Sequence, residues 1–415
     1  MRFFWLGALL VSAPVYLSGQ MQMGGPVSTL RDNVLRHSSS GTSLEPESNA
    51  PPMLMRMSGK WMEMLHGEVN VVEQQQTGPR GHGKLFSVNW VMPMAQRPTT
   101  HGQWTFVSML SLEPATITGR YYPELFQQGE TAFGKAIVDG QHPHNLIMEL
   151  AAIYDLNLGK RGLATLYAAP VGDPSLGPVA FPHRMSAESD PLAPLAHHLQ
   201  DSTHIAYDVV TGGLTWWSFR LEASGFHGRE PGENRWTIEY GPVDSWSTRL
   251  TTALGRDWIA QYSVGHLHSP EALHPDEDVL RQTASVSLHH AWSVADIDTT
   301  AVWGRNHTIG TEVNANGYLL EGEMRLRAKQ SIWTRIENDD RTTDLLGSAA
   351  PPDESVVGRV QAYTGGYAHR IFKTDWSAVE LGAQVTLYTT PPRLLTLYGS
   401  HPVGVAALLH WRIGK

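Results

Sequence analysis

One predicted strand, near residues 317–328, puts charged side chains on one face and apolar side chains on the other, because successive residues of a strand point to opposite sides. A soluble sheet would have to bury one of these faces in a dry core, where four neighbouring charges are costly. The segment is instead typical of a barrel wall that lies between lipid and water. The charged face carries Glu321, Glu323, Arg325 and Arg327, and the apolar face carries Tyr318, Leu320, Met324 and Leu326.

The same two-residue period recurs along most of the chain after residue 59. We expect an all-β fold, a transmembrane antiparallel β-barrel of about 16 strands (roughly 12–16), in the lipid bilayer of the outer membrane. The strand-like segments are residues 60–74, 84–94, 102–113, 146–157, 162–170, 203–211, 213–225, 244–254, 257–268, 282–293, 296–307, 317–328, 331–338, 356–371, 375–388 and 402–413.

The predicted connections alternate between short turns and long loops. Short turns are expected at residues 159–162, 211–213, 255–257 and 373–375. We assign Thr211-Gly212-Gly213 to a hairpin turn, because glycine accepts the positive φ angles that such turns need. Outer-membrane barrels have short periplasmic turns and long external loops. The long loops are expected at residues 114–145, 171–202, 226–243, 269–281 and 339–355.

The chain before residue 59 differs from the rest in composition. Residues 1–19 have Arg2 followed by a short apolar run, which is typical of a secretory signal peptide. Residues 20–58 are rich in Met, Ser and Pro without a clear period, so we expect a flexible arm ahead of a barrel spanning residues 59–415. The methionines of the arm are either soft ligands for Cu(I) or ordinary apolar side chains, and the second interpretation is favoured.

Composition argues against several classes of protein. The formal net charge is −9 and no basic run is present, so nucleic acid is not expected as a partner. The chain has no cysteine, which fits an envelope protein that avoids mispairing in an oxidising compartment. After residue 19 no apolar run approaches the roughly 20 residues of a membrane helix. A membrane span would therefore have to be built from strands.

Twenty histidines are a large number, and many of them lie in the predicted long loops. Neutral imidazole is the commonest metal ligand, and a site gathers three or four ligands from different segments. Two adjacent loops would supply such a site for copper or zinc. The alternative is that these histidines hydrogen-bond to nearby carboxylates and line a channel mouth, and this interpretation is favoured. The candidate ligands are His142, His144, His183, His197, His198 and His204.

A second candidate set mixes histidines with hard oxygen donors. Its spacing matches neither a His-Glu-x-x-His helix nor a calcium loop, so the pattern is not specific. Its members are His266, His268, Glu271, His274, Asp276, Glu277 and Asp278.

The sequence contains no recognised catalytic motif. It has no Gly-x-Ser-x-Gly elbow and no phosphate-binding glycine-rich loop. Asp201, Ser202 and His204 are residue types that a hydrolase uses, but their spacing does not arrange a nucleophile beside a base. An enzyme is therefore the least favoured class, and we expect no catalytic residue and no cofactor other than copper or zinc.

Several loop motifs are long enough to be specific. They are SLEPAT at residues 111–116, GETA at 129–132, DGQHPH at 139–144, FPHR at 181–184, QDSTH at 200–204, GREP at 228–231, SPEAL at 269–273 and PDED at 275–278. Together they resemble a family of uncharacterised, signal-bearing outer-membrane-type barrel proteins of Gram-negative-type bacteria, over nearly the whole chain after residue 59. Some members of that family are associated with resistance to copper and other heavy metals, so the resemblance implies a metal role.

These observations predict an outer-membrane barrel that acts as a pore or binding channel for small polar solutes or ions, linked to copper handling through the histidine-rich loops. A first alternative is a metal-sequestering envelope protein in which the barrel is only a scaffold. A second is a hydrolase embedded in the barrel. The expected partners are the lipid bilayer and either small polar solutes or metal ions.

Overall fold

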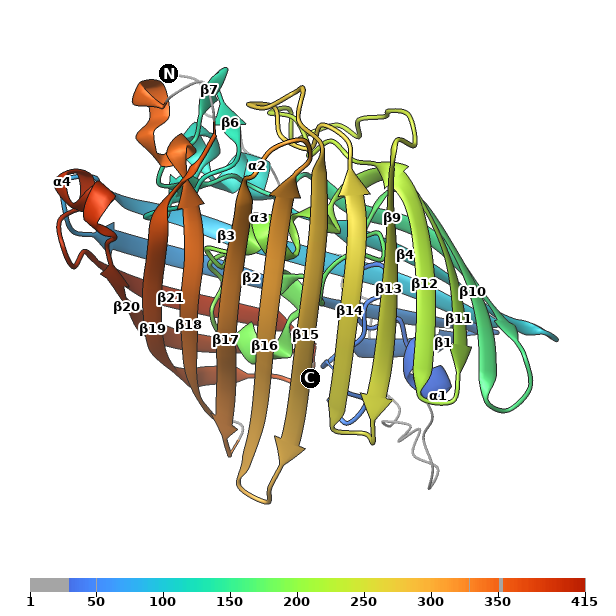
Figure 1. Ribbon diagram of the computed structural model, residues 1–415. Helices are drawn as coiled ribbons and strands as arrows, with labels where there is room; N and C mark the ends of the chain where they lie inside the picture. The colour runs from blue at the N-terminus through green and yellow to red at the C-terminus, as the bar shows by residue number, and fades with distance from the viewer. Residues whose placement is uncertain (1–29, 50, 328, 351–353, 415) are drawn as a thin grey trace, which may run out of the picture.

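The computed structural model describes residues 30–49, 51–327, 329–350 and 354–414, so the predicted signal peptide at residues 1–19 lies outside the described residues. One antiparallel sheet closes on itself where β2 (Trp61–Gln76) pairs with β21 (Val403–Ile413) (Figure 1). This sheet has 17 strands, and the short β1 (Leu54–Ser58) pairs only with β2, which leaves sixteen in the closed wall. The predicted all-β barrel of about 16 strands is confirmed.

The other wall strands follow one another around the barrel in chain order, each antiparallel to the next. They are β3 (Gly83–Pro98), β4 (Gly102–Leu110), β9 (Ile147–Asn157), β10 (Gly162–Gly172), β11 (Ala206–Trp216), β12 (Phe219–His227), β13 (Ser245–Leu254), β14 (Trp258–Leu267), β15 (Val279–Ala291), β16 (Ala295–Thr308), β17 (Asn314–Leu326), β18 (Gln330–Thr342), β19 (Val356–Lys373) and β20 (Ser377–Thr389).

The remaining elements are short and are not part of the barrel wall. Among the described residues, no helix has the length and apolar character needed to cross a bilayer. The short strands are β5 (Tyr122–Pro123), β6 (Thr131–Ala132), β7 (Lys135–Ala136) and β8 (Gly140–Gln141). The helices are α1 (Leu30–Val34), α2 (Glu113–Thr116), η1 (Thr118–Arg120), η2 (Phe181–His183), η3 (Met185–Ala187), α3 (His197–Gln200), η4 (Ser202–His204), η5 (Thr343–Ala349), η6 (Pro392–Leu394) and α4 (Leu395–Tyr398).

The wall has an apolar outer face and a polar inner face. On β17, Leu320 is 47% exposed on the outside, whereas Glu321 and Glu323 point into the lumen and are each 1% exposed. Arg325 also faces inward, but Arg327 is exposed in the turn beyond the strand, so its predicted inward position is wrong because the alternation stops at the strand end. A continuous apolar exterior around charged side chains is stable when lipid surrounds it. The chain is an outer-membrane β-barrel.

Short turns and long loops gather at opposite ends of the barrel, as predicted (Figure 1). One predicted turn is wrong, because β11 runs straight through Gly212 and Gly213 and the chain reverses at residues 217–218. A Cβ on Gly213 would lie 2.9 Å from Nη2 of Arg220. This glycine therefore makes room for an inward-pointing guanidinium on the neighbouring strand and does not form a turn.

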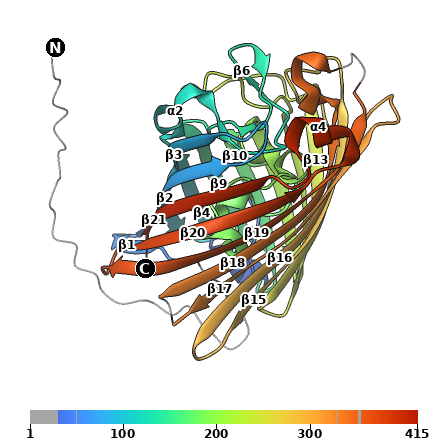
Figure 2. The ribbon, with the colours of Figure 1, turned by 90° about the vertical axis from the view of Figure 1, so that its left-hand side faces the viewer.

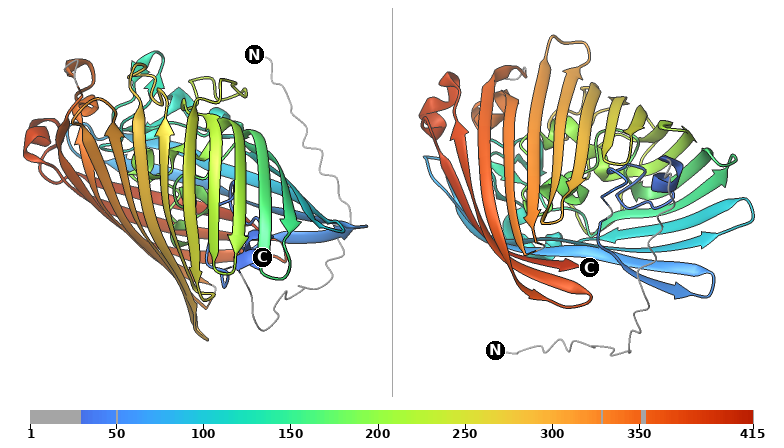
Figure 3. Two further views of the ribbon diagram at one scale, coloured as in Figure 1. Left: turned by 45° about the vertical axis from the view of Figure 1, so that its right-hand side comes forward. Right: turned by 90° about the horizontal axis from the view of Figure 1, so that it is seen from below.

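The described part of the predicted flexible arm is folded into the barrel. Residues 30–49, called here the N-terminal segment, lie inside the lumen near the short-turn end (Figure 3). His37 Nε2 lies 2.7 Å from Asp155 Oδ2, and Ser40 donates to Asp173 Oδ2 at 2.9 Å. Within the predicted flexible arm of residues 20–58, residues 30–49 therefore have fixed hydrogen-bonding partners inside the barrel, and residues 54–58 form β1.

The loop between β10 and β11, residues 173–205, also folds into the lumen and is called here the plug loop (Figures 1 and 2). A barrel of this size ordinarily encloses a water-filled channel. Here α3 and η3 contact the inner faces of β16 and β17, and the plug loop is almost entirely buried. Opposite charges join the plug loop to the wall. These ion pairs are Arg184 with Glu321 at 2.9 Å, Asp190 with Arg335 at 3.1 Å and Glu188 with Arg412 at 2.5 Å.

Glu45 connects the N-terminal segment to the plug loop, where its carboxylate accepts a hydrogen bond from the backbone N–H of Met185 at 3.2 Å. Burial, reinforced by Asp298, raises the pKa of Glu45 from 4.5 to about 8. A group whose pKa is higher in the docked state contributes stability below its free pKa and loses that contribution as the pH rises through the docked value. The N-terminal segment is therefore held more tightly at acidic pH than at alkaline pH.

We expect proteolysis within residues 30–49 to become faster as the pH rises from 5 to 8, by at most about tenfold per pH unit. A protease that is active over this range, used on the protein folded in detergent with corrections for its own pH profile, measures the effect. Glu45→Gln removes the titrating group, so its cleavage rate should change less with pH. An equal pH dependence in both proteins would contradict the assignment to Glu45.

Candidate functional site

All six histidines predicted from the sequence lie buried in the lumen, although they come from two separate loops. The rings of His197 and His198 lie 5.2 Å apart, and those of His197 and His204 lie 5.3 Å apart. His144 is 5.3 Å from His204, again between ring centres. His142 and His144 follow β8, His183 ends η2, His197 and His198 begin α3, and His204 ends η4.

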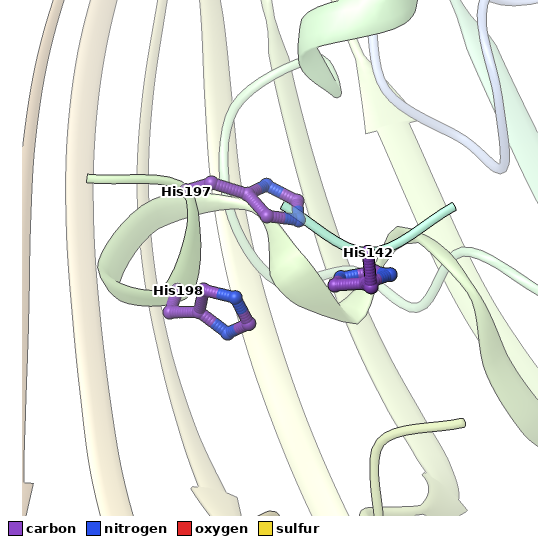
Figure 4. Close-up of side chains that lie close together, drawn as sticks. All are labelled: His142, His197 and His198. Carbon is purple, nitrogen blue, oxygen red and sulfur yellow. The ribbon is translucent and has the colours of Figure 1, made fainter. Parts of the chain in front are cut away.

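Three of these side chains approach one another most closely and are called here the histidine cluster: His142, His197 and His198 (Figure 4). One ring nitrogen from each lies within 4.8 Å of the other two. His197 and His198 are consecutive on the first turn of α3, and His142 reaches them from the other loop. Three imidazoles at this separation match the number of protein ligands in many zinc and copper sites.

The Nδ1 atom of each ring in the histidine cluster already has an oxygen partner. His142 Nδ1 lies 3.0 Å from the carbonyl oxygen of Pro143, and His197 Nδ1 lies 2.7 Å from Asp201 Oδ1. His198 Nδ1 lies 3.4 Å from Glu230 Oε1. For His197 the carboxylate partner favours the tautomer with the proton on Nδ1, which leaves Nε2 free to accept. Histidines that bind metals are oriented in this way by oxygen atoms behind them.

The carboxylate of Glu130 is already in close contact with His142. Its Oε1 atom lies 2.5 Å from His142 Nε2, and Glu130 also forms an ion pair with Arg235. A cation that binds His142 Nε2 therefore either displaces this carboxylate or binds it as well, and imidazole with carboxylate is a donor set that a borderline cation accepts.

The protonation of the histidine cluster also suits metal binding in part. Burial lowers the pKa of His142 well below its usual range, and burial lowers the pKa of His197 as well. For His198 burial also opposes the charge, but the carboxylates of Glu230 and Glu130 outweigh it and raise the pKa. Two of the three rings are therefore neutral at neutral pH, and the neutral ring is the form that binds metals.

Of the other three predicted histidines, His204 and His144 continue from the histidine cluster, whereas His183 lies beside Met109 and Trp90 of the wall. His204 Nδ1 lies 2.8 Å from a backbone carbonyl oxygen, and its Nε2 atom has no hydrogen-bond partner among the described residues. His144 Nδ1 lies 2.9 Å from Glu113 Oε1. His183 Nε2 lies 3.2 Å from the sulfur of Met109. Burial lowers the pKa of both His204 and His183 well below the usual range, so these rings are neutral.

The second predicted set does not form one site. His266 and His268 both face Asp278, at 3.2 and 2.8 Å, near the long-loop end. His274 points away from them toward Asp344 at 3.2 Å, and this hydrogen bond raises the pKa of His274 to about 9. A histidine with that pKa is protonated at neutral pH and acts as an ion-pair partner. The predicted set is therefore divided into two separate groups of histidine–carboxylate contacts, one around Asp278 and one around Asp344.

Asp201, Ser202 and His204 do not assemble a hydrolytic site. His204 Nδ1 contacts the backbone oxygen of Asp201, and the carboxylate of Asp201 faces His197. The hydroxyl of Ser202 accepts a hydrogen bond from Arg281 Nη1 at 2.9 Å. These side chains hold the plug loop in place and do not pair a nucleophile with a base.

Three carboxylates that contact the histidines could not be assigned to them from the sequence. They belong to the loop motifs SLEPAT, GETA and GREP, which carry no histidine, and spacing along the chain does not show which histidine each carboxylate meets. The pairs are Glu113 with His144, Glu130 with His142 and Glu230 with His198.

No protein-family model matches this chain, and no curated protein matches it. Solved structures similar to it include outer-membrane barrels. The anion-selective porin from Comamonas acidovorans is 11% identical, with a TM-score of 0.48 over 85% of this chain and 99% of the porin. The outer membrane channel DcaP of Acinetobacter baumannii is 10% identical, with a TM-score of 0.49 over 86% and 99% of the two chains. OmpF of Salmonella typhi is 7% identical, with a TM-score of 0.49 over 86% and 100%.

Proposed function

We propose that this barrel is a binding channel of the outer membrane for small polar solutes or ions, and that its histidine cluster binds copper or zinc as cargo. The observation that carries the proposal is the meeting of three imidazole rings inside the lumen, with one ring nitrogen of each within 4.8 Å of the other two. Imidazole nitrogen is a ligand that both Cu²⁺ and Zn²⁺ accept.

The shape of the lumen supports a binding channel over a passive pore. The plug loop and the N-terminal segment fill the interior, so a solute meets binding groups along its way. A cavity of about 50 Å³ lies at the long-loop end, and His198 is one of the residues that line it. Glu271 and His274 line the same cavity. A cation that enters this cavity would meet His198 of the histidine cluster.

We expect the full-length protein folded in detergent to bind Zn²⁺ or Cu²⁺, and the combined substitution H142A, H197A and H198A to weaken that binding by at least about 100-fold. The loss is large because a bound ion would lose all three nitrogen ligands. Isothermal titration with each metal measures the affinity, and heat-dependent migration on a gel verifies that the barrel is folded.

A matched control replaces three exposed histidines of the barrel ends, with H82A, H101A and H401A in one protein. This control should bind the metals as the unaltered protein does. Equal affinity in the control and in the histidine-cluster variant would contradict the proposed metal cargo.

A second candidate, a metal-sequestering protein with the barrel as scaffold, is favoured by the same filled lumen. The two candidates differ in transport, because only a channel releases the cation on the other side of the membrane. Uptake of Zn²⁺ by vesicles that contain the protein supports the channel, and binding without uptake supports the scaffold.

A further inference from the structure

A separate group of soft donor atoms lies on the inner wall, away from the residues of the histidine cluster. His66 on β2 pairs directly with Met92 on β3 in the sheet register. Met109 lies on β4, and the neighbouring pair Met94–Val107 places it next to Met92. Directly paired residues of antiparallel strands point to the same face of the sheet. The wall therefore presents one imidazole and two thioethers side by side, all of them buried.

The plug loop adds a second imidazole to this group. His183 Nε2 lies 3.2 Å from the sulfur of Met109, and the ring of His183 lies 5.8 Å from the ring of His66 between centres. The ring of Trp90 is 4.4 Å from His183 and 5.0 Å from His66. Two wall strands and the plug loop therefore bring two imidazoles and one thioether together against an indole ring.

One nitrogen of this group has no hydrogen-bond partner. His66 is 4% exposed, and its Nε2 atom has no partner among the described residues. Burial without a partner is costly for an imidazole nitrogen, which points to a ligand that this atom binds. The contact between His183 and Met109 is a weak hydrogen bond at most, since thioether sulfur is a poor acceptor.

We propose that His66, His183 and Met109 form a site for a soft monovalent cation of the Cu(I) or Ag(I) class, called here the His–Met site. Thioether sulfur is a soft, uncharged ligand that selects such ions. Two ligands that bind one ion at about 2.0–2.3 Å lie about 3–4 Å apart, which is the observed separation of His183 Nε2 and the Met109 sulfur. The indole ring of Trp90 lies beside both imidazoles and shields the site from water.

A cavity of about 30 Å³ adjoins the His–Met site and is lined by His66, Trp90 and His183. Ser38 and Pro52 also line it, so this cavity lies beside the N-terminal segment and toward the short-turn end. The cavity at His198 lies toward the opposite end of the barrel, where the long loops gather. The His–Met site stands without the proposed function, and only its use as a second step in the passage of a cation rests on that function.

The test uses the full-length protein folded in detergent, loaded with Ag⁺ in a chloride-free nitrate buffer. We expect X-ray absorption at the silver edge to show sulfur and nitrogen neighbours. Met109→Leu, which conserves volume, should remove the sulfur neighbour and weaken Ag⁺ binding by at least about tenfold in equilibrium dialysis. The control Met57→Leu changes a methionine that is 56% exposed on β1 and should leave both measurements unchanged.

A selenomethionine-substituted protein needs no mutation in the site and should show selenium in place of sulfur around the silver ion. Ag⁺ surrounded by nitrogen and oxygen alone, or equal Ag⁺ affinity in Met109→Leu and the unaltered protein, would overturn the His–Met site. The H142A, H197A and H198A protein separates the two proposals, because it should retain the sulfur-ligated Ag⁺ while losing Zn²⁺. Retained Zn²⁺ binding in that variant counts against the proposed function alone.

Discussion

Replacing residues 175–203 of the plug loop with a short Gly-Ser linker is expected to convert a barrel of low ionic conductance into a wide, permanently conducting pore. Sixteen strands enclose a lumen that is wide enough for a water-filled channel when nothing occupies it. The inner wall carries the charged and polar side chains of a hydrated surface. In the unaltered protein the plug loop lies buried against β16 and β17 inside the lumen, so we expect little room for water along the barrel axis.

Single-channel recording in a planar bilayer measures this effect. The plug loop variant should show steps of roughly porin size, and the unaltered protein should show rare or much smaller steps. A control that replaces the exposed residues 309–312 with a Gly-Ser linker of equal length should conduct as the unaltered protein does. Similar conductance in all three proteins would mean that the plug loop does not control passage through the lumen.

Arg335→Met is expected to destabilise the folded protein by about 3–5 kcal/mol. The guanidinium of Arg335 is buried, and it pairs with Asp190 of the plug loop at 3.1 Å and with Glu321 of the wall at 3.1 Å. It also donates a hydrogen bond to the carbonyl oxygen of Leu192 at 2.8 Å. Removing this cation leaves the buried carboxylate of Asp190 without its arginine and leaves Glu321 with Arg184 alone, and an uncompensated buried charge costs more than the ion pair itself contributes.

Urea unfolding in detergent micelles, followed by tryptophan fluorescence, measures this loss. The matched control is Arg359→Met on β19, where the guanidinium faces Asp340 at 3.0 Å and its side chain is 41% exposed. Water replaces the lost partner at that position, so the control should lose no more than about 1 kcal/mol. An equal loss of stability in the two variants would contradict the importance of burial for the Arg335 pairs.

The wall and the plug loop are joined mainly by buried charge pairs, which bears on how the plug loop opens. Arg184 of the plug loop faces Glu321 at 2.9 Å, and Glu188 faces Arg412 at 2.5 Å. Because these pairs are buried, salt in the surrounding solution screens them weakly. Separating them requires water to enter between the plug loop and the wall. We therefore expect opening to be a slow step, which is consistent with binding of cargo ahead of passage.

The strand pattern could be predicted from the sequence because it is a local property. Glu321 and Leu320 are neighbours in the chain and must point to opposite faces of a strand, whatever the rest of the molecule does. The sixteen predicted segments correspond one to one with the sixteen strands of the wall. The error at Gly212 and Gly213 has a clear origin, since glycine occurs both in turns and beside a bulky partner such as Arg220.

The candidate site could be predicted only in part. Loop position and residue type were enough to select six histidines that lie together in the lumen, but they did not show which carboxylate orients which ring. His66 and Met109 escaped notice because they lie on wall strands, where an isolated histidine or methionine looks like an ordinary inward-facing side chain. Their meeting with His183 depends on the path of the plug loop.

The amino-acid sequence alone determined that this chain forms a β-barrel with lipid outside and charge inside, because alternation along each strand decides which side chains share a face. Only the tertiary structure decided that the lumen is filled. The N-terminal segment and the plug loop mix polar and apolar residues, and their sequences alone do not show whether they lie in water or against the inner wall. That choice depends on partners such as Asp155 and Glu321, which come from strands far away in the chain.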